Sequence, residues 1–387
     1  MTDSGFRVLG VFLYLISFSS NANAFPEMIR HGYANCSACH VSLTGGGVLN
    51  DYGRELSREL LATWKGNEKL KENQFLWGAL GSPREDQTKG RPRIQDWLKL
   101  GGDIRSVYLY KNTDTATSGQ TIFMQGDFEA AAVLKKLTID ATAGIEQPIP
   151  GIPIDFISRR HFVQYSLTDE FNLRAGRFIP AYGINTADHV ELTRDPLRLG
   201  DQWSSYNFEA SYITDKYNIF VTGILGRIDN PSLEHEKGGA LQATYAPSEK
   251  VKLGGEVYFG ENDNERRWLF GPLGLIGITD RLMLQSEIDF QMNYQKTLAL
   301  GPDTQGWVSS QKLSYEITDG IWVFGDQEYG KFAFDIPLSE VQIYGVGMQF
   351  FPRTHFEFNV SFEKVRNLSA NSGDFYDYAW LMTHFYL

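Results

Sequence analysis

The sequence of 387 residues has only two cysteines, no long apolar run in its body and no excess of basic residues. Two cysteines are too few for a disulfide-stabilised scaffold, and 42% hydrophobic and 14% aromatic residues exclude a disordered chain. The formal net charge of −11 argues against nucleic-acid binding, because such proteins carry a basic face. No stretch after residue 24 reaches the roughly 18 apolar residues of a membrane-spanning helix.

The first 24 residues are predicted to be a secretory signal peptide. Arg7 precedes an apolar run over residues 8–18, which leads to Ala22-Asn23-Ala24, an A-x-A cleavage pattern. An uncleaved anchor helix is the alternative, but this run is too short to span a bilayer. We therefore expect cleavage after Ala24 and a mature chain that lies outside the cytoplasm.

Both cysteines lie in Cys36-Ser37-Ala38-Cys39-His40, a C-x-x-C-H motif. This spacing is that of c-type haem attachment, in which two thiols tether one macrocycle and the histidine ligates its iron. A thioredoxin-type disulfide would need a βαβ context, and a zinc site would need further ligands, yet residues 41–123 contain no histidine. We predict one haem c tethered by Cys36 and Cys39, with His40 as the proximal ligand.

The sequence motif does not identify the sixth ligand of the haem iron. Neither histidine nor methionine occurs between His40 and Met124, so the usual downstream ligand is absent. His31 is the first candidate, and Met28 and an open position are the alternatives; methionine would raise the reduction potential. Arg54 is a candidate partner of a haem propionate, with a solvated surface arginine as the alternative.

Residues 25–95 are predicted to form this small, mostly helical or irregular haem domain. It contains a glycine turn at 45–47 and a helical run that ends near Trp64. About 70 residues are marginal for an independent core, so we expect a bound macrocycle, or docking inside a larger structure, to supply apolar contacts.

From residue 96 onward the pattern changes to period two, which indicates β-strands with one apolar face. Phe356, Phe358 and Val360 alternate with Glu357 and Asn359, and the same alternation recurs over 282–291 and 137–146. The opposite faces carry charges on strand after strand, which favours a membrane barrel over a secreted soluble β-protein.

Short polar turns separate pairs of strands and alternate with longer connections, as in bacterial outer-membrane barrels. They occur at 135–136, 168–169, 214–215, 247–249, 279–280, 318–319 and 352–353. The predicted strands start near residues 97, 121, 137, 157, 170, 207, 217, 238, 250, 265, 281, 306, 321, 340, 355 and 376. The fold class is therefore all-β, a 16-stranded antiparallel transmembrane β-barrel over 96–387 in the bacterial outer membrane.

The longest connection, from about Pro180 to Tyr206, follows the fifth strand and is the third outer loop. Residues 173–178 lead into it and resemble the corresponding porin stretch, whose third loop folds inward and narrows the pore. This resemblance implies lumen or constriction roles for Arg174, Arg177, Asp188, His189, Glu191, Arg194 and Arg198. An exposed outer loop is the alternative.

The order of signal peptide, single haem motif and barrel resembles the fused cytochrome–porin family of the outer membrane, whose best-known members oxidise ferrous iron. The motif at 36–40 and the segment 49–54, Leu-Asn-Asp-Tyr-Gly-Arg, carry the resemblance. The glycine triplet at 45–47 departs from the iron oxidases and favours a branch with another donor or acceptor. The resemblance implies an extracellular electron donor or acceptor, with Fe(II) one candidate, and a periplasmic soluble cytochrome or other carrier.

These features predict an outer-membrane electron conduit with one haem c, in which residues 25–95 plug the barrel from the periplasmic mouth. The alternatives are a diffusion or substrate-specific porin with a haem-bearing plug, and a haem enzyme or gas sensor in which His31 acts as a base. Whether the protein is an enzyme, an oxidoreductase for an extracellular donor, stays open. The expected partners are outer-membrane lipid and electron carriers, not nucleic acid, and a homotrimer is an open expectation because wide porins often form trimers.

Overall fold

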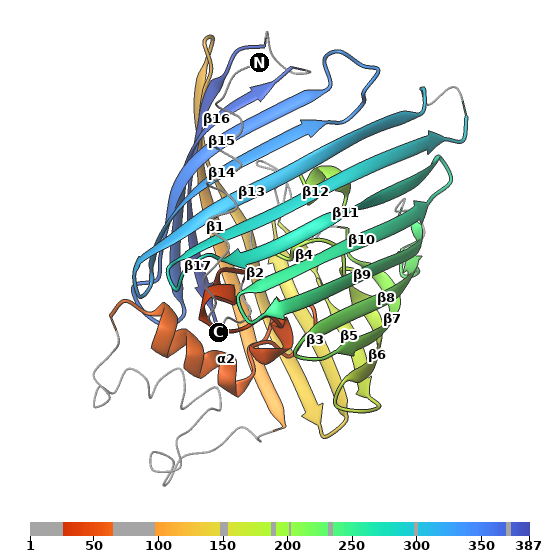
Figure 1. Ribbon diagram of the computed structural model, residues 1–387, viewed down its shortest axis with the longest axis vertical. Coiled ribbons are helices and arrows are strands. Elements are labelled where there is room, and N and C mark those ends of the chain that lie inside the picture. The colour runs from red at the N-terminus through yellow and green to blue at the C-terminus, as the bar shows by residue number, and fades with distance from the viewer. Residues whose placement is uncertain are drawn as a thin grey trace.

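The computed structural model describes residues 26–64, 97–147, 154–186, 191–200, 203–230, 235–297, 301–368 and 373–387. From Leu98 onward the chain forms a closed antiparallel β-barrel, in which β1 pairs with both β2 and β17 (Figure 1). Segments β4 and β5 both pair with β3 and share one position, so the barrel has 16 strands, as predicted. The predicted signal peptide, 1–24, lies outside the described residues.

The strands are β1 (Leu98–Asn112), β2 (Thr117–Leu134), β3 (Leu137–Glu146), β4 (Asp155–Ile157), β5 (His161–Ser166), β6 (Phe171–Phe178), β7 (Ser205–Ile213), β8 (Tyr217–Gly226), β9 (Lys237–Ser248), β10 (Val251–Glu261), β11 (Glu265–Gly277), β12 (Leu282–Gln295), β13 (Thr304–Thr318), β14 (Ile321–Lys331), β15 (Glu340–Phe350), β16 (Phe356–Asn367) and β17 (Tyr376–Tyr386). The predicted starts agree with these bounds, and the largest difference is at β2. This strand begins four residues early because a tight turn, in which the backbone N–H of Ala116 donates to the carbonyl of Thr113, replaces the expected longer loop.

The two faces of the wall are inverted relative to a water-soluble protein. On β8, Ile219 and Val221 point outward and Val221 is 54% exposed, whereas Asn218 and Thr222 point inward and Thr222 is 2% exposed. Such alternation puts apolar side chains where lipid would lie and polar side chains in the lumen. The closed ladder leaves no unpaired edge, which is the condition for β-structure inside a bilayer.

The barrel has a turn end, formed by the short turns such as 214–216 and 319–320, and a loop end with the longer connections. The N-terminal segment 26–64, red to orange in Figure 1, lies at the turn end beside the C-terminus. It consists of short helices, namely η1 (Pro26–His31), η2 (Cys36–Ala38), α2 (Asp51–Leu56) and η3 (Ser57–Leu61). Among the described residues, no helix is long and apolar enough to cross a membrane.

Candidate functional site

The C-x-x-C-H motif forms one helical turn. The backbone N–H groups of Cys39 and His40 both donate to the carbonyl oxygen of Cys36, at 3.1 and 3.0 Å. Positions i, i+3 and i+4 of a helical turn share one face, so the two sulfur atoms and the imidazole belong to the same side of this turn. Both thiols are free.

Helix α2 is fastened to this turn by the residues that follow the motif. The Asn50 side chain caps α2 by accepting from the backbone N–H of Gly53 at 2.8 Å, and its amide nitrogen donates to the carbonyl of Ala38 at 2.9 Å. A Cβ atom at Gly53 would lie 2.3 Å from the carbonyl oxygen of Cys39, so only glycine fits there. The segment 49–54 is thus a structural support for the motif.

The glycine triplet 45–47 is required by close packing rather than by flexibility alone. All three residues have positive φ, at 84°, 72° and 65°, where L side chains are strained. A Cβ at the first would lie 3.2 Å from Cβ of Cys36, and one at the third would lie 2.4 Å from a carboxylate oxygen of Glu129 on β2. This turn therefore brings the motif directly against the barrel wall.

The donor set of the motif fits covalent haem. Burial raises the pKa of the Cys39 thiol to about 12, which does not fit a thiol that exchanges disulfides. Burial and then the charge of Arg160 lower the pKa of His40 to about 4, so its imidazole is neutral at pH 7, the form that ligates iron. The Nδ1 atom of His40 is buried without a hydrogen-bond partner.

The zinc alternative finds no support in the geometry. Zinc sits about 2.3 Å from each sulfur ligand, so its ligand atoms must converge on one point. Within the described ranges, a single group of three acidic, histidine or cysteine residues brings its ligand atoms within 4.8 Å of one another, and it does not include the motif. Two thioethers to separate positions of one macrocycle need no such convergence.

The candidate sixth ligands are held by neighbours other than the motif. His31 Nε2 lies 3.3 Å from a carboxylate oxygen of Glu316 on β13 and 3.2 Å from Nε of Arg30. Met28 is buried in η1, which packs on β11 and β12. The identity of the sixth ligand stays a prediction.

Arg54 has a structural role that its sequence position did not reveal. Its side chain is 1% exposed and donates to the carbonyl oxygens of Leu49, at 3.3 Å, and of Leu100 on β1. The guanidinium therefore fastens α2 to the first strand. The predicted contact of Arg54 with a haem propionate stays a prediction.

Residues 26–64 enter the barrel and contact its inner wall on many sides, so we call them the plug. Arg30 pairs with Glu316 at 3.1 Å, and both side chains are buried. Asn35 and Thr63 donate to backbone carbonyls of two short turns, which places the plug at the turn end. Further contacts to β10, β13 and β17 are made by Lys252 to the Ala34 carbonyl (2.8 Å), Lys312 to Glu27 (3.3 Å) and Tyr386 to Ser57 (2.8 Å).

Arg174 and Arg177, two of the predicted lumen or constriction residues, are buried on the inner side of the wall. Arg174 is 2% exposed; it donates to Glu209 on β7 at 2.7 Å and to the plug residue Ser42 at 3.1 Å. Arg177 is also buried and donates to Ser204 at 3.0 Å. Arg174 therefore links the wall to the plug, and the predicted constriction role of both arginines stays a prediction.

The other predicted constriction residues belong to the third loop, which we define as residues 179–204. Glu191 and Arg194 are buried, and Arg194 pairs with a carboxylate of β12. Arg198 is about one-third exposed and pairs with a carboxylate of β11. Asp188 and His189 lie outside the described residues.

The third loop folds into the barrel, as the resemblance to porins implied. The backbone N–H of Leu192 donates to Glu328 on β14 at 2.6 Å, and Arg267 on β11 donates to the carbonyl of Leu197. Loop and wall residues share one apolar cluster inside the lumen, formed by Tyr182, Leu192, Leu197, Leu199, Ile224, Ala240, Tyr258, Leu269 and Val308. The loop is thus fixed to the wall opposite its own strands.

The plug and the third loop meet inside the barrel. Ile29 of the plug and Ile184 of the loop pack in one cluster with the wall residues Leu273, Leu275 and Met283. The side-chain amide of Asn185 donates to the carbonyl of Thr44 at 2.8 Å. Protein from both ends therefore obstructs the lumen, and the motif lies on the plug side of this contact.

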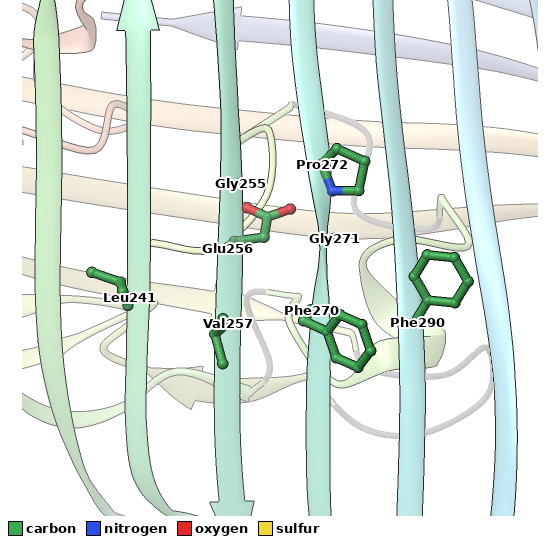
Figure 2. Close-up of a pocket in the computed structure, with 8 residues that line it drawn as sticks. All are labelled: Leu241, Gly255, Glu256, Val257, Phe270, Gly271, Pro272 and Phe290. Carbon is green, nitrogen blue, oxygen red and sulfur yellow. The ribbon is translucent and has the colours of Figure 1, made fainter.

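An apolar groove of about 430 Å³ lies on the outer face of the wall (Figure 2). It opens where Gly255 and Gly271 lack side chains and where residues 271–272 interrupt the pairing of β11 with β12. Its side walls are Leu241, Val257, Phe270 and Phe290. The groove belongs to the apolar outer surface of the wall, and its lining also includes Glu256 of β10, which is 4% exposed.

No protein-family model and no curated protein sequence matches the chain. Solved structures do match. OmpTdeltaL8, a loop L8 deletion mutant of the outer membrane protein OmpT of Vibrio cholerae, has a TM-score of 0.58 at 9% identity, over 75% of this chain and 99% of that one. The trimer form of in-vitro folded OmpT of Vibrio cholerae gives 0.55 at 9%, and an anion-selective porin from Comamonas acidovorans gives 0.55 at 11%, both over 75% of this chain and 99% of theirs. At these identities the likeness concerns the fold, and the fold of this chain is a porin-like β-barrel.

Proposed function

We propose that this chain is an outer-membrane barrel whose plug carries one haem c, and that it passes electrons rather than solutes. The observation that carries the proposal is the position of the C-x-x-C-H turn, on a segment fastened inside an obstructed lumen. A fold built to conduct solutes gains nothing from such an obstruction, whereas a redox centre gains insulation from lipid and solvent.

The outer-membrane location rests on the wall and on the predicted export signal. Apolar side chains cover the outside of a closed barrel, and polar side chains fill its inside, as in bacterial outer-membrane proteins. In-vitro folded OmpT of Vibrio cholerae, which has a similar fold, is described as an outer membrane protein. Its trimer form makes a homotrimer the expected assembly of this chain.

Each residue of the motif has a distinct proposed role. Cys36 and Cys39 hold the macrocycle by thioethers, and neutral His40 is the proximal ligand. Haem c supplies a centre that accepts and releases one electron. The wall keeps this centre out of the lipid, the third loop controls which molecules approach it from the loop end, and the plug exposes the other side to the turn end.

Distance gives the physical reason for a centre inside the lumen. The apolar belt of an outer-membrane barrel is roughly 25 Å tall, which is too long for one efficient electron hop. A centre within the barrel divides that distance. A periplasmic soluble cytochrome is the proposed partner at the turn end, and an extracellular donor or acceptor, Fe(II) among the candidates by the family resemblance, is the partner at the loop end.

A solute channel with a movable plug is the second candidate, and the porin fold favours it. One structure with this fold is described as an anion-selective porin, and another as the outer membrane channel DcaP of Acinetobacter baumannii. In this case the plug would have to leave the lumen before solutes pass, and a haem would serve only to stabilise it.

Visible spectra of the purified barrel test the proposal, with Cys36→Ala/Cys39→Ala as the matched control. Cells that mature c-type cytochromes supply the protein, and spectra are taken oxidised and after dithionite. We expect a low-spin reduced α-band that the control lacks, together with no single-channel current from the intact protein. A high-spin spectrum that shifts with carbon monoxide would favour a haem enzyme or sensor, and no haem with an open current would leave the solute channel.

A further inference from the structure

Three carboxylates meet in the lumen beneath the third loop. Glu256 on β10 and Glu287 and Asp289 on β12 are 4%, 2% and 0% exposed. One oxygen atom from each lies within 4.8 Å of the others. Period-two alternation predicted that Glu287 and Asp289 share the inner face of one strand, but only the closed barrel brings Glu256 beside them.

The third loop covers this cluster with its backbone and one tyrosine. Successive residues of the loop donate one hydrogen bond to each carboxylate: Tyr182 Oη to Asp289 Oδ1 (2.6 Å), Gly183 N to Glu256 Oε2 (2.5 Å) and Ile184 N to Glu287 Oε2 (2.6 Å). A Cβ at Gly183 would lie 2.3 Å from Glu287 Oε1, so the loop approaches as closely as glycine allows.

The charge in this enclosure is not balanced by the chain. Within the described part of the chain, Arg194 is the cation that pairs with the cluster, and its Nη2 donates to both oxygens of Glu287, at 2.6 and 2.7 Å. Three ionised carboxylates and one guanidinium leave two negative charges without compensation. Buried charges of this kind are strongly unfavourable unless another group neutralises them.

Two buried oxygen atoms of the cluster have no hydrogen-bond partner among the residues that the structure describes. Glu256 Oε1 and Asp289 Oδ2 accept no hydrogen bond, although both side chains are at least nine-tenths buried. The other oxygen of each is already used by the loop. Unsatisfied buried acceptors are rare in folded proteins and call for an ion, a water or a proton.

The geometry points to a divalent-cation site formed by Glu256, Glu287 and Asp289. Hard divalent ions such as Ca²⁺ and Mn²⁺ take carboxylate oxygens as ligands, and two positive charges neutralise the excess. The ion ties strands β10 and β12 together under the third loop and so fixes the loop in its inward position. This inference is independent of haem, because it uses no residue of the plug.

Titration calorimetry with Ca²⁺, and separately with Mn²⁺, tests the site on the purified full-length barrel after chelator treatment. We expect one site in the natural protein, weakened more than about tenfold by Asp289→Asn and by Glu256→Gln, because loss of even a supporting partner of a metal ligand costs that much. Asp140→Asn is the matched control: this lumen-facing carboxylate of β3 is also buried, but β3 lies across the barrel from β12.

Heat-modifiable gel mobility shows in the same samples that each variant is a folded barrel, and the two cluster variants guard against the failure of one of them to fold. Unchanged binding in the Asp140→Asn protein, with loss in both cluster variants, supports the site. No binding by the natural protein would overturn it and indicate that protons neutralise the carboxylates. Equal loss in the Asp140→Asn protein would overturn it as well, because binding would then depend on lumen charge in general.

Discussion

The plug and the third loop both fill the lumen, but they are held there in different ways. The third loop continues into β6 and β7 at its two ends, and its backbone N–H groups bind carboxylates of β10, β12 and β14. The plug contacts strands around the whole circumference, mostly through side chains, as in the buried pair of Arg30 with Glu316. The loop is therefore part of the wall, whereas the plug is an inserted body whose position depends on noncovalent contacts.

Because of this difference, we expect changes in the plug to affect its function without lowering the stability of the barrel. Backbone hydrogen bonds and strand connections remain when the plug is altered, so variants of the plug should change lumen occupancy and haem content without unfolding the barrel. Variants under the third loop act on the wall itself. The following predictions test this expectation, from the largest expected effect to the smallest.

Removal of residues 26–64 should have the largest effect. The plug fills the turn end of the lumen, so its loss should open the part of the cross-section that the third loop does not cover. We expect single-channel current in planar bilayers from the shortened protein and none from the full chain. A full chain that conducts like an open porin, or a shortened one that stays silent, would contradict the account.

The Cys36→Ala/Cys39→Ala variant should lose all covalent haem and keep a folded barrel. Neither thiol forms a disulfide, and each change removes one sulfur atom from a plug that is held by other contacts. Haem staining of denaturing gels measures the first effect, and heat-modifiable mobility measures the second. Retention of covalent haem in this variant would exclude the motif as its attachment point.

The Glu316→Gln variant should loosen the plug at the turn end. It leaves the Arg30 guanidinium buried without its counter-charge, and breaking a buried pair in this way costs about 3–5 kcal/mol. Hydrogen exchange of residues 26–31 should rise, while exchange in the strands stays low. The matched control is Glu261→Gln, which removes an exposed partner of Arg266 and should leave plug exchange unchanged.

Acid should weaken the turn end through His355, which lies in the turn before β16. Burial lowers its pKa to about 4, although its Nδ1 donates to the Tyr386 carbonyl at 2.7 Å. Because the folded pKa lies below the ordinary value near 6.5, the unfolded state binds the proton first. The contribution of His355 to the free energy of unfolding is therefore fully present above about pH 6.5. This contribution, about 3 kcal/mol, is lost as the pH falls from 6.5 through 4.

Thermal unfolding of the barrel in detergent between pH 7.5 and 4 measures this loss. The free energy of unfolding should depend less steeply on pH in a His355→Gln variant, because glutamine does not titrate. If the variant and the natural protein showed the same pH dependence, the acid sensitivity would come from other groups. Of the four predicted effects, this loss of stability is expected to be the smallest, because it depends on one side chain at the rim of the barrel.

The wall follows from the sequence because its determinants are local. Alternation in β16 and the short turns between strand pairs fixed the strand starts to within four residues, and the strand count followed from them. The contacts in the lumen are not local: Arg174 reaches Ser42 across 132 positions, and Arg54 reaches the carbonyl of Leu100 across 46. No spacing rule links such residues, so the structural contacts of these two buried arginines could not be predicted from the sequence.

The sequence pattern also did not predict that the fourth strand of the barrel is divided into β4 and β5. Residues between β4 and β5 leave the ladder where Arg159 turns to Asp127 and Glu146, each at 2.8 Å. Charge pairing inside the lumen competes there with backbone pairing. The motif itself was identified from spacing alone, and the structure adds the reason for its neighbours, since Asn50 and Gly53 hold the turn in place.

Electron transfer across a sealed vesicle tests the central claim most directly. The purified barrel is inserted into liposomes that enclose a soluble cytochrome and a small dye, and a reductant too large to enter the lumen is added outside. The account predicts that the enclosed cytochrome is reduced while the dye is retained, and that the Cys36→Ala/Cys39→Ala protein fails to reduce it. Dye release, or no reduction by the haem-loaded protein, would contradict a barrel that passes electrons and not solutes.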